Sequence, residues 1–131
     1  MRTSLVIPAY NEEEGLPLVV REYLDVVDEV IMVDDGSSDG TFQAAQALVG
    51  GKVKLLRHEV NQGKVAALRT GVLQASGDII IFTDADNTYP ARYVPQLVQE
   101  IEKGADLVLG ARIQARENIP AFNRLGNNIF S

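Results

Sequence analysis

Short apolar runs rich in Val and Ile alternate along the chain with longer amphipathic segments, and this alternation limits the possible folds more than any other feature. The runs predict buried strands at 5–7, 30–33, 53–56, 79–82 and 107–109. Apolar residues at helical spacing predict helices over 12–27, 38–48, 64–74 and 90–101. Strands that alternate with helices form βαβ units, so the pattern predicts an α/β fold with a mostly parallel sheet.

Within the predicted helix at 64–74, Val65, Leu68 and Val72 form one apolar face. After residue 110 the regularity lapses, and residues 112–120 are expected to form a polar loop. A new helix is expected to begin at Phe122. Its apolar face is more typical of a core contact than of an interfacial membrane helix, the alternative interpretation.

Size and charge exclude several classes of function. At 131 residues the chain is most simply one domain, 1–131. A net charge of −6 argues against a nucleic-acid-binding protein, which normally carries a basic stripe. The chain has no Cys, which fits a cytoplasmic protein. Because no apolar stretch reaches the ~20 residues that cross a bilayer, we expect any membrane contact to be peripheral.

Two carboxylates separated by one residue, Asp84 and Asp86, follow directly after the predicted strand at 79–82. In open α/β sheets, ligands bind at the carboxyl edge of the strands. Acids at a packed strand end cost desolvation energy unless a ligand uses them. Hard oxygen ligands suit Mg²⁺ or Mn²⁺ bound together with substrate phosphates. The pair therefore predicts metal-assisted chemistry on a diphosphate.

The loop after the first predicted strand has both a binding and a structural interpretation. Tyr10 offers a flat face for stacking, and Glu12 can accept a hydrogen bond from a ribose hydroxyl. Alternatively, Asn11 caps the following helix and Glu12 complements the helix dipole. On this loop alone, the structural interpretation is favoured.

The acidic loop after the second predicted strand also has a binding and a structural interpretation, and neither is favoured. A carboxylate here, such as Asp35, can accept the imino N–H of a nucleobase, while Gly36 permits close backbone approach. The alternative is an ordinary turn in which Asp39 caps the next helix.

Three further charged residues are candidates of lower specificity. Lys64 opens a predicted helix whose amino end can face phosphate, although it can equally be a solvated first-turn residue. Arg112 follows the fifth predicted strand and can either neutralise a diphosphate or lie on the surface. His58, the only His, has no Ser or Cys partner pattern and is interpreted as structural.

Taken together, the loops resemble those of family 2 glycosyltransferases with the GT-A fold, a Rossmann-like, three-layer α/β/α structure that binds nucleotides. Each motif is weak alone, but their order and spacing are specific. The resemblance rests on Ile7-Pro8-Ala9-Tyr10-Asn11-Glu12-Glu13, on Val33-Asp34-Asp35-Gly36-Ser37-Ser38-Asp39-Gly40-Thr41, on Asn61-Gln62-Gly63-Lys64 and on Asp84-Ala85-Asp86. Residues 83–90, 110–112 and 123–127 look most like the branch that makes polyprenyl-phosphate sugars, in which dolichyl or undecaprenyl phosphate attacks a GDP- or UDP-sugar.

The resemblance implies roles for individual residues. Asp84 and Asp86 would hold Mg²⁺ or Mn²⁺, and Asp86 and Arg112 would serve catalysis. Family members often place a Gln two residues after the second acid as a further metal ligand, but Thr88 stands at that position here. The nucleotide sugar would be bound by Pro8, Ala9, Tyr10, Glu12, Val33, Asp35, Lys64, Asp84, Ala85 and Arg112.

The implied reaction is an inverting displacement that moves a hexose from a UDP- or GDP-linked donor to polyprenyl phosphate. Because a phosphate acceptor is already ionised, no strong general base is required. The family normally continues with an acceptor-binding half, and this chain ends where that half would begin, at about 113–131. We expect the incomplete sheet edge to favour a homodimer.

Two other functions compete with this one. In a haloacid-dehalogenase-like phosphatase, Asp84 would be the nucleophile and Asp86 the acid/base, but that motif usually follows the first strand rather than the fourth. A non-catalytic module that binds a nucleotide sugar would have the same pocket without turnover. A phospho-receiver domain is a weaker alternative, since its acid pair also follows the first strand.

Overall fold

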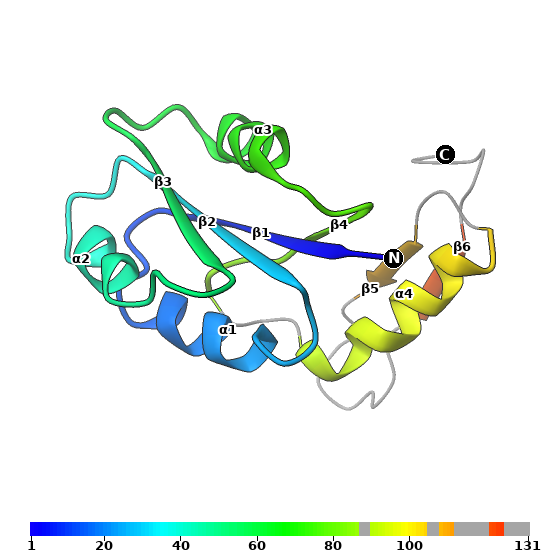
Figure 1. Cartoon of the computed structure of the whole chain (residues 1–131). Coiled ribbons are helices and arrows are strands. Elements are labelled where there is room, and N and C mark those ends of the chain that lie inside the picture. Colours follow the sequence, from blue (N-terminus) through cyan, green and yellow to red (C-terminus); the bar gives the residue numbers. More distant parts are fainter. Residues whose placement is uncertain (87–89, 105–107, 112–120, 125–131) are drawn as a thin grey trace. The chain divides into compact units, whose positions relative to one another are not determined.

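The computed structural model describes residues 1–86, 90–104, 108–111 and 121–124 (Figure 1). Contacts among Cα atoms divide the chain into two compact units, Met1–Pro90 and Ala91–Ser131. Each unit has a sheet of its own, four-stranded in the first and two-stranded in the second.

The first unit is built on a parallel sheet with the strand order β3-β2-β1-β4. Helices α1 and α2 lie on one face of this sheet and α3 lies on the other, which gives three layers (Figure 1). The predicted α/β fold with a parallel sheet is confirmed. The elements along the chain are β1 (Thr3–Ala9), α1 (Gly15–Tyr23), β2 (Glu29–Asp35), α2 (Thr41–Gln46), β3 (Val53–His58), α3 (Lys64–Gln74) and β4 (Ile79–Phe82).

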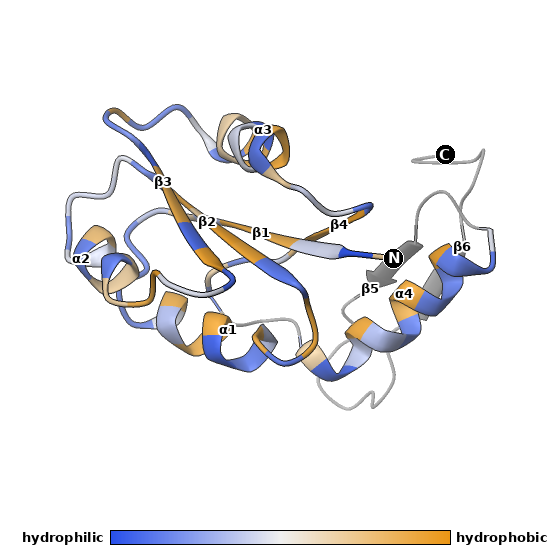
Figure 2. Cartoon of the chain, in the orientation of Figure 1, coloured by the Kyte–Doolittle hydropathy of each residue, from blue (hydrophilic) through white to orange (hydrophobic). Residues whose placement is uncertain are grey.

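The two central strands form the core of this unit. Every residue of β2 is buried, and so is every residue of β1 except Pro8. Figure 2 shows the apolar residues concentrated along these strands. Strands covered by helices on both faces have no solvent side, so they consist of nearly continuous apolar residues rather than an alternating pattern.

Helix α3 packs on the sheet through its smallest residues. Ala67 and Gly71 are buried, and a Cβ at Gly71 would lie 2.3 Å from Cγ1 of Val6. By contrast, two residues of the predicted apolar face, Val65 and Val72, are 80% and 39% exposed. The helix approaches the strands so closely that only small side chains fit between them, and hydropathy spacing does not reveal this.

The second unit contains a 3₁₀ helix (Ala91–Tyr93), α4 (Val94–Glu102), β5 (Val108–Ala111) and β6 (Ala121–Arg124). One prediction is wrong here. The fifth predicted strand is present as β5 and pairs antiparallel with β6, but β6 takes the place of the helix expected to begin at Phe122. Pairing with a distant strand decides the conformation of such a short segment. In the described parts of the chain, no helix is long and apolar enough to cross a membrane.

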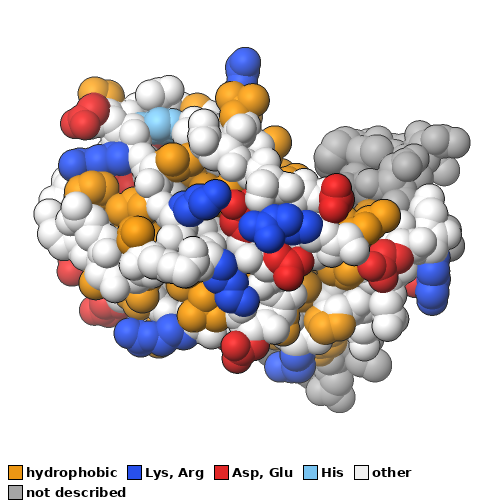
Figure 3. All heavy atoms as spheres, viewed as in Figure 1, with side chains coloured by type: hydrophobic (Ala, Val, Ile, Leu, Met, Phe, Trp, Pro, Cys, Tyr) orange, Lys and Arg blue, Asp and Glu red, His pale blue; other side chains and the backbone are white. Residues whose placement is uncertain are grey.

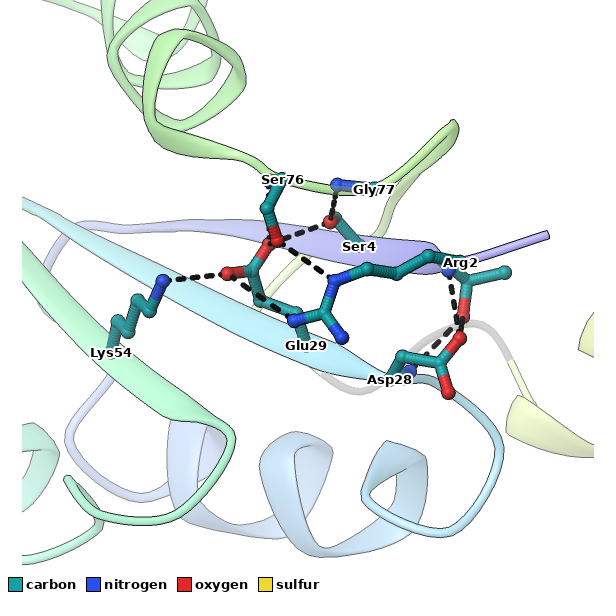
Figure 4. Close-up of polar contacts among 8 residues, drawn as sticks. Arg2, Ser4, Asp28, Glu29, Lys54, Ser76 and Gly77 are labelled. Atoms are coloured by element: carbon teal, nitrogen blue, oxygen red, sulfur yellow. Dashed lines mark hydrogen bonds and ion pairs between the residues drawn. The ribbon is translucent and has the colours of Figure 1, made fainter.

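A buried carboxylate ties the amino edge of the parallel sheet together. Glu29 opens β2, and its side chain is 1% exposed. Its Oε1 accepts hydrogen bonds from Ser4 Oγ at 2.7 Å and from the Ser76 N–H at 2.8 Å, and its Oε2 accepts one from Lys54 Nζ at 2.7 Å (Figure 4). Burial acts to raise the pKa of Glu29, but these hydrogen bonds outweigh it and lower the pKa to about 2.

Candidate functional site

A pocket of about 370 Å³ opens at the carboxyl edge of the parallel sheet. The loops after β1, β2 and β4 and the amino end of α3 form it, and its size suits a small-molecule ligand. All predicted site residues that the structure describes line it, except Val33. The lining residues are Pro8, Ala9, Tyr10, Glu12, Asp35, Asn61, Gly63, Lys64, Ala67, Asp84, Ala85 and Asp86.

One predicted site residue in the described part of the chain is not brought to this pocket. Val33 is fully buried and packs in the core with Ile31 and Ala67. Arg112 lies outside the described residues, as does Thr88. The lining residue Ala67 was missed, and no signal in the sequence distinguishes it from any other helical Ala.

Asn11 ties the loops after β1 and β2 together. Its side-chain Oδ1 accepts a hydrogen bond from the Ser38 N–H at 2.9 Å, and its own N–H donates to Ser37 Oγ at 2.9 Å. The alternative that Asn11 caps α1 is wrong, because the N-cap of α1 is Glu14 and no side chain caps it. Asn11 therefore fixes the spacing of two loops that border the pocket.

Tyr10 and Glu12 reach the pocket from the loop after β1. The Tyr10 side chain is half exposed, so its ring is available for stacking. The Glu12 N–H donates to Thr41 Oγ1 at 2.8 Å, and Glu12 lines the pocket. Asp39 Oδ1 accepts the Thr41 N–H at 2.9 Å at the start of α2. The N-cap of α2 is Gly40, however, and no side chain caps the helix there, so the alternative that Asp39 is the cap is wrong.

Asp35, at the end of β2, is buried and already has several partners. Its Oδ1 accepts the Gln62 N–H at 2.9 Å and lies 2.8 Å from His58 Nδ1, and its Oδ2 accepts the Gly63 N–H at 2.9 Å. Burial acts to raise the pKa of Asp35, but the hydrogen bonds from Gln62, His58 and Gly63 outweigh it and hold the pKa below its ordinary value. Asp35 therefore holds the loop that precedes Lys64, in addition to lining the pocket.

His58 supports Asp35 from β3. Its second ring nitrogen, Nε2, lies 2.7 Å from Thr70 Oγ1 on α3, and the residue is 8% exposed. These contacts agree with the predicted structural role of His58, although the pairing with Asp35 was not foreseen. The loop also packs on Gly36, whose φ is +73° and where a Cβ would lie 2.5 Å from the Asn61 nitrogen. Gly36 thus permits the close approach of the Asn61 backbone, whereas the predicted approach of a ligand to Gly36 stays a prediction.

The segment after β4 presents its acids and buries the residues between and before them. Thr83 and Ala85 are 4% and 3% exposed, whereas Asp84 is one-third exposed and Asp86 is exposed. Asp84 Oδ1 pairs with Lys64 Nζ at 2.5 Å. This alternation is the one expected where a strand ends, because successive side chains point to opposite sides.

Gly15 makes room for this segment at the amino end of α1. A Cβ at Gly15 would lie 2.3 Å from the carbonyl oxygen of Ala85. Any larger residue at position 15 would push the backbone that carries Asp84 and Asp86. No local sequence pattern predicts this contact, because it joins residues that are 70 positions apart in the numbering.

Among the described residues that line the pocket, Lys64 is the one cation beside the four carboxylates of Glu12, Asp35, Asp84 and Asp86. On the face seen in Figure 3, Lys and Arg side chains lie interspersed with Asp and Glu. The chain as a whole carries 18 acidic and 12 basic residues, so the ratio of acids to cations is higher among the described pocket-lining residues than in the whole chain.

The donor set at the pocket fits a hard divalent cation that is shared with a ligand. Asp84 and Asp86 supply carboxylate oxygens, the donors that Mg²⁺ and Mn²⁺ prefer. Within the described ranges, no group of three or more His, Cys, Asp or Glu residues is arranged to hold a metal ion. Two carboxylates completed by phosphate oxygens and water are typical of magnesium sites in nucleotide-binding enzymes.

Comparison with known proteins gives consistent matches. The sequence model described as "Glycosyl transferase family 2" matches residues 4–130. Dolichol-phosphate mannosyltransferase of Pyrococcus furiosus is 33% identical over 133 aligned positions, which cover 95% of this chain and 38% of that protein. The chain thus spans about two fifths of the length of this relative.

Two solved structures are similar in fold. The mannosyltransferase of Pyrobaculum calidifontis in complex with GDP-Man and Mn²⁺ superposes with a TM-score of 0.68 at 29% identity, over 87% of this chain and 36% of that chain. Glucosyl-3-phosphoglycerate synthase of Mycobacterium tuberculosis, in complex with Mn²⁺, UDP-glucose and phosphoglyceric acid, superposes with a TM-score of 0.67 at 32% identity, over 79% and 40% of the two chains.

Proposed function

Since the chain belongs to glycosyl transferase family 2 and has the GT-A type of α/β fold, we propose that it binds a UDP- or GDP-linked hexose as the donor of a glycosyl transfer. The observation that carries the proposal is the meeting of Tyr10, Glu12, Lys64 and the Asp84–Asp86 pair in one pocket at the carboxyl edge of the sheet. An aromatic face, a ribose acceptor, a cation and two metal-binding carboxylates are the groups that a nucleotide sugar needs.

Each part of the donor has a corresponding group in the pocket. The half-exposed Tyr10 ring would stack on the base, and Glu12 would accept from the ribose hydroxyls. Lys64 would meet the diphosphate at the amino end of α3, where backbone N–H groups favour anions. Asp84 and Asp86 would hold Mg²⁺ or Mn²⁺, which supplies neutralising charge to the diphosphate as it leaves.

We further propose that the acceptor is a polyprenyl phosphate. The support is the similarity to dolichol-phosphate mannosyltransferase over 95% of the chain. An ionised phosphate acceptor needs no strong general base, and an inverting displacement follows from direct attack at the anomeric carbon. Arg112 would assist the leaving diphosphate, and a lipid acceptor would bring the protein to a membrane surface as a peripheral contact.

The alternative functions receive less support. The two acids follow β4, at the edge of the parallel sheet, whereas a haloacid-dehalogenase-like phosphatase places them after the first strand. A non-catalytic nucleotide-sugar-binding module would have the same pocket, so a turnover assay distinguishes it from a transferase.

The donor site is tested by calorimetric titration of the chain with UDP-glucose and with GDP-mannose, each with Mn²⁺ and with chelator. We expect Mn²⁺-dependent binding of one of them, which names the base. We expect the double variant Asp84→Asn, Asp86→Asn to lose that binding while it remains folded. Binding that persists with chelator or in the double variant contradicts the metal role, and no binding of either sugar nucleotide contradicts the donor site.

A further inference from the structure

We propose that Lys64 is an exchangeable counter-ion. It pairs with Asp84, and it turns to the phosphates of the donor when a divalent cation takes Asp84. This role rests on the proposed function, and it assigns to Lys64 an effect on metal affinity as well as on nucleotide affinity.

The pairing of Lys64 with Asp84 places an ammonium group where the divalent cation has to bind. Lys64 Nζ lies 2.5 Å from Asp84 Oδ1, within direct hydrogen-bonding distance. A divalent cation on the same oxygen would lie only a few ångströms from that ammonium group, and like charges at such a distance repel. The ammonium and the metal ion therefore compete for Asp84.

The Lys64 side chain is also placed so that it can move. It is the first residue of α3, it follows Gly63 with a φ of +100°, and its side chain is 60% exposed. Asp84 is 33% exposed, and an ion pair that is open to water is held only weakly. The backbone around Lys64 is fixed, since Asp35 holds the Gly63 N–H, so the side chain alone changes its partner.

The second partner that we propose for Lys64 is the diphosphate of the donor, and the charges of the pocket-lining residues favour this pairing. Among the described lining residues Lys64 is the one cation, while Glu12, Asp35, Asp84 and Asp86 are acidic. A nucleoside diphosphate entering this pocket needs cationic partners, and a metal on the acids frees Lys64 to meet it. Loss of the Lys64 charge should therefore affect the two ligands in opposite directions: tighter binding of the metal alone and weaker binding of the nucleotide.

The test compares Lys64→Met with the matched variant Lys103→Met. Lys103 pairs with Glu100 at 3.6 Å, is 63% exposed and is not among the pocket-lining residues, so its variant removes the same charge from a residue that does not line the pocket. Binding of Mn²⁺ alone is followed by the electron paramagnetic resonance of the free ion, and binding of UDP and of GDP at saturating Mn²⁺ is followed by calorimetry. Circular dichroism confirms that each variant is folded.

In Lys64→Met we expect Mn²⁺ alone to bind about threefold to tenfold more tightly than in the unsubstituted chain. We expect the nucleoside diphosphate that binds to do so about tenfold more weakly. Lys103→Met should change neither affinity, and Lys64→Arg should keep the nucleotide affinity.

If Lys64→Met weakens both ligands, or leaves Mn²⁺ affinity unchanged, the counter-ion role is wrong while the proposed function stands. If the unsubstituted chain binds neither UDP nor GDP with Mn²⁺, the proposed function and the role of Lys64 both fail.

Discussion

Carboxylates occupy both edges of the same parallel sheet, but the protein treats them differently. At the amino edge, Glu29 is 1% exposed and receives hydrogen bonds from Ser4, Ser76 and Lys54. At the carboxyl edge, Asp84 is 33% exposed and pairs with the ammonium group of Lys64, whose side chain is 60% exposed. Both groups lie at a strand end, yet only Glu29 is enclosed by donors from several elements.

The difference separates a carboxylate that stabilises the fold from one that is available to a ligand. Enclosure by fixed donors makes removal of the charge costly, because the donors are left unpaired in a buried place. An exposed acid with one long cationic partner contributes little to stability and can exchange that partner. Asp35 is the intermediate case, since it lines the pocket but its carboxylate is held by backbone N–H groups.

The largest expected effect comes from Glu29→Gln. This substitution keeps the size of the side chain but leaves Lys54 and the Ser76 N–H without a charged acceptor, so we expect the free energy of unfolding to fall by about 3 kcal/mol. Urea denaturation measures it. Glu100→Gln is the control, because it breaks only the exposed pair with Lys103 and should change stability by less than about 0.5 kcal/mol. If Glu29→Gln changes the free energy of unfolding as little as Glu100→Gln does, the hydrogen bonds that enclose Glu29 do not stabilise the fold.

Acid should produce an effect of nearly the same size. The pKa of Glu29 falls from 4.5 to about 2 on folding, so below about pH 5 the unfolded chain takes up this proton before the folded protein does. The stabilisation is fully present above the unfolded pKa and is lost as pH falls toward about 2, in total about 3 kcal/mol. Asp28, Asp35 and Asp39, whose pKa values are also lowered, act in the same direction.

Urea denaturation at a series of pH values checks this dependence. Glu29→Gln should flatten the loss of stability between about pH 5 and pH 2, because it removes the group with the largest pKa change. An acid dependence of equal steepness in both proteins would show that other carboxylates dominate.

Much of the fold could be predicted from local sequence. Strands β1, β2 and β4 contain continuous apolar runs between turn residues, and α3 and β4 were predicted with the bounds that they have. The prediction failed where pairing between distant segments decides the structure, as for β6, whose four residues form a strand opposite β5. It also failed for the packing face of α3, because closeness of approach at Gly71 depends on the partner strand.

The residues that line the candidate site could largely be predicted from the sequence, but the hydrogen bonds that hold them in place could not. Motifs at three strand ends predict a shared pocket because parallel strands end at one edge of the sheet, and the lining residues follow. The contacts between loops were not predictable. Two such contacts are the hydrogen bond of Asn11 with Ser38 and that of His58 with Asp35. Both join residues more than 20 positions apart, and each of these side chains has several possible polar partners in the sequence.

A moderate effect is expected from Gly15→Ala. The new Cβ would meet the Ala85 carbonyl oxygen at 2.3 Å, so either α1 or the acidic segment has to shift. We expect a loss of about 1–2 kcal/mol in unfolding free energy and weaker Mn²⁺-dependent nucleotide binding, measured by urea denaturation and calorimetry. Leu18→Ala is the control on the same helix, because Leu18 is 51% exposed and points away from the core. If both variants behave alike, the contact at Ala85 does not position the acids.

The smallest effect on stability is expected from Asp84→Asn. This variant is also the sharpest test of the difference between the carboxylates at the two edges of the sheet. It removes one carboxylate charge and keeps the side-chain size, as Glu29→Gln does at the opposite edge. Because the pair with Lys64 is exposed, its loss should change the free energy of unfolding by less than about 0.5 kcal/mol. Mn²⁺ binding should nevertheless be lost, since one of two carboxylate ligands is gone. If Asp84→Asn instead destabilises the protein as much as Glu29→Gln while Mn²⁺ binding is retained, the acids after β4 serve the fold, and the division between the two edges of the sheet is wrong.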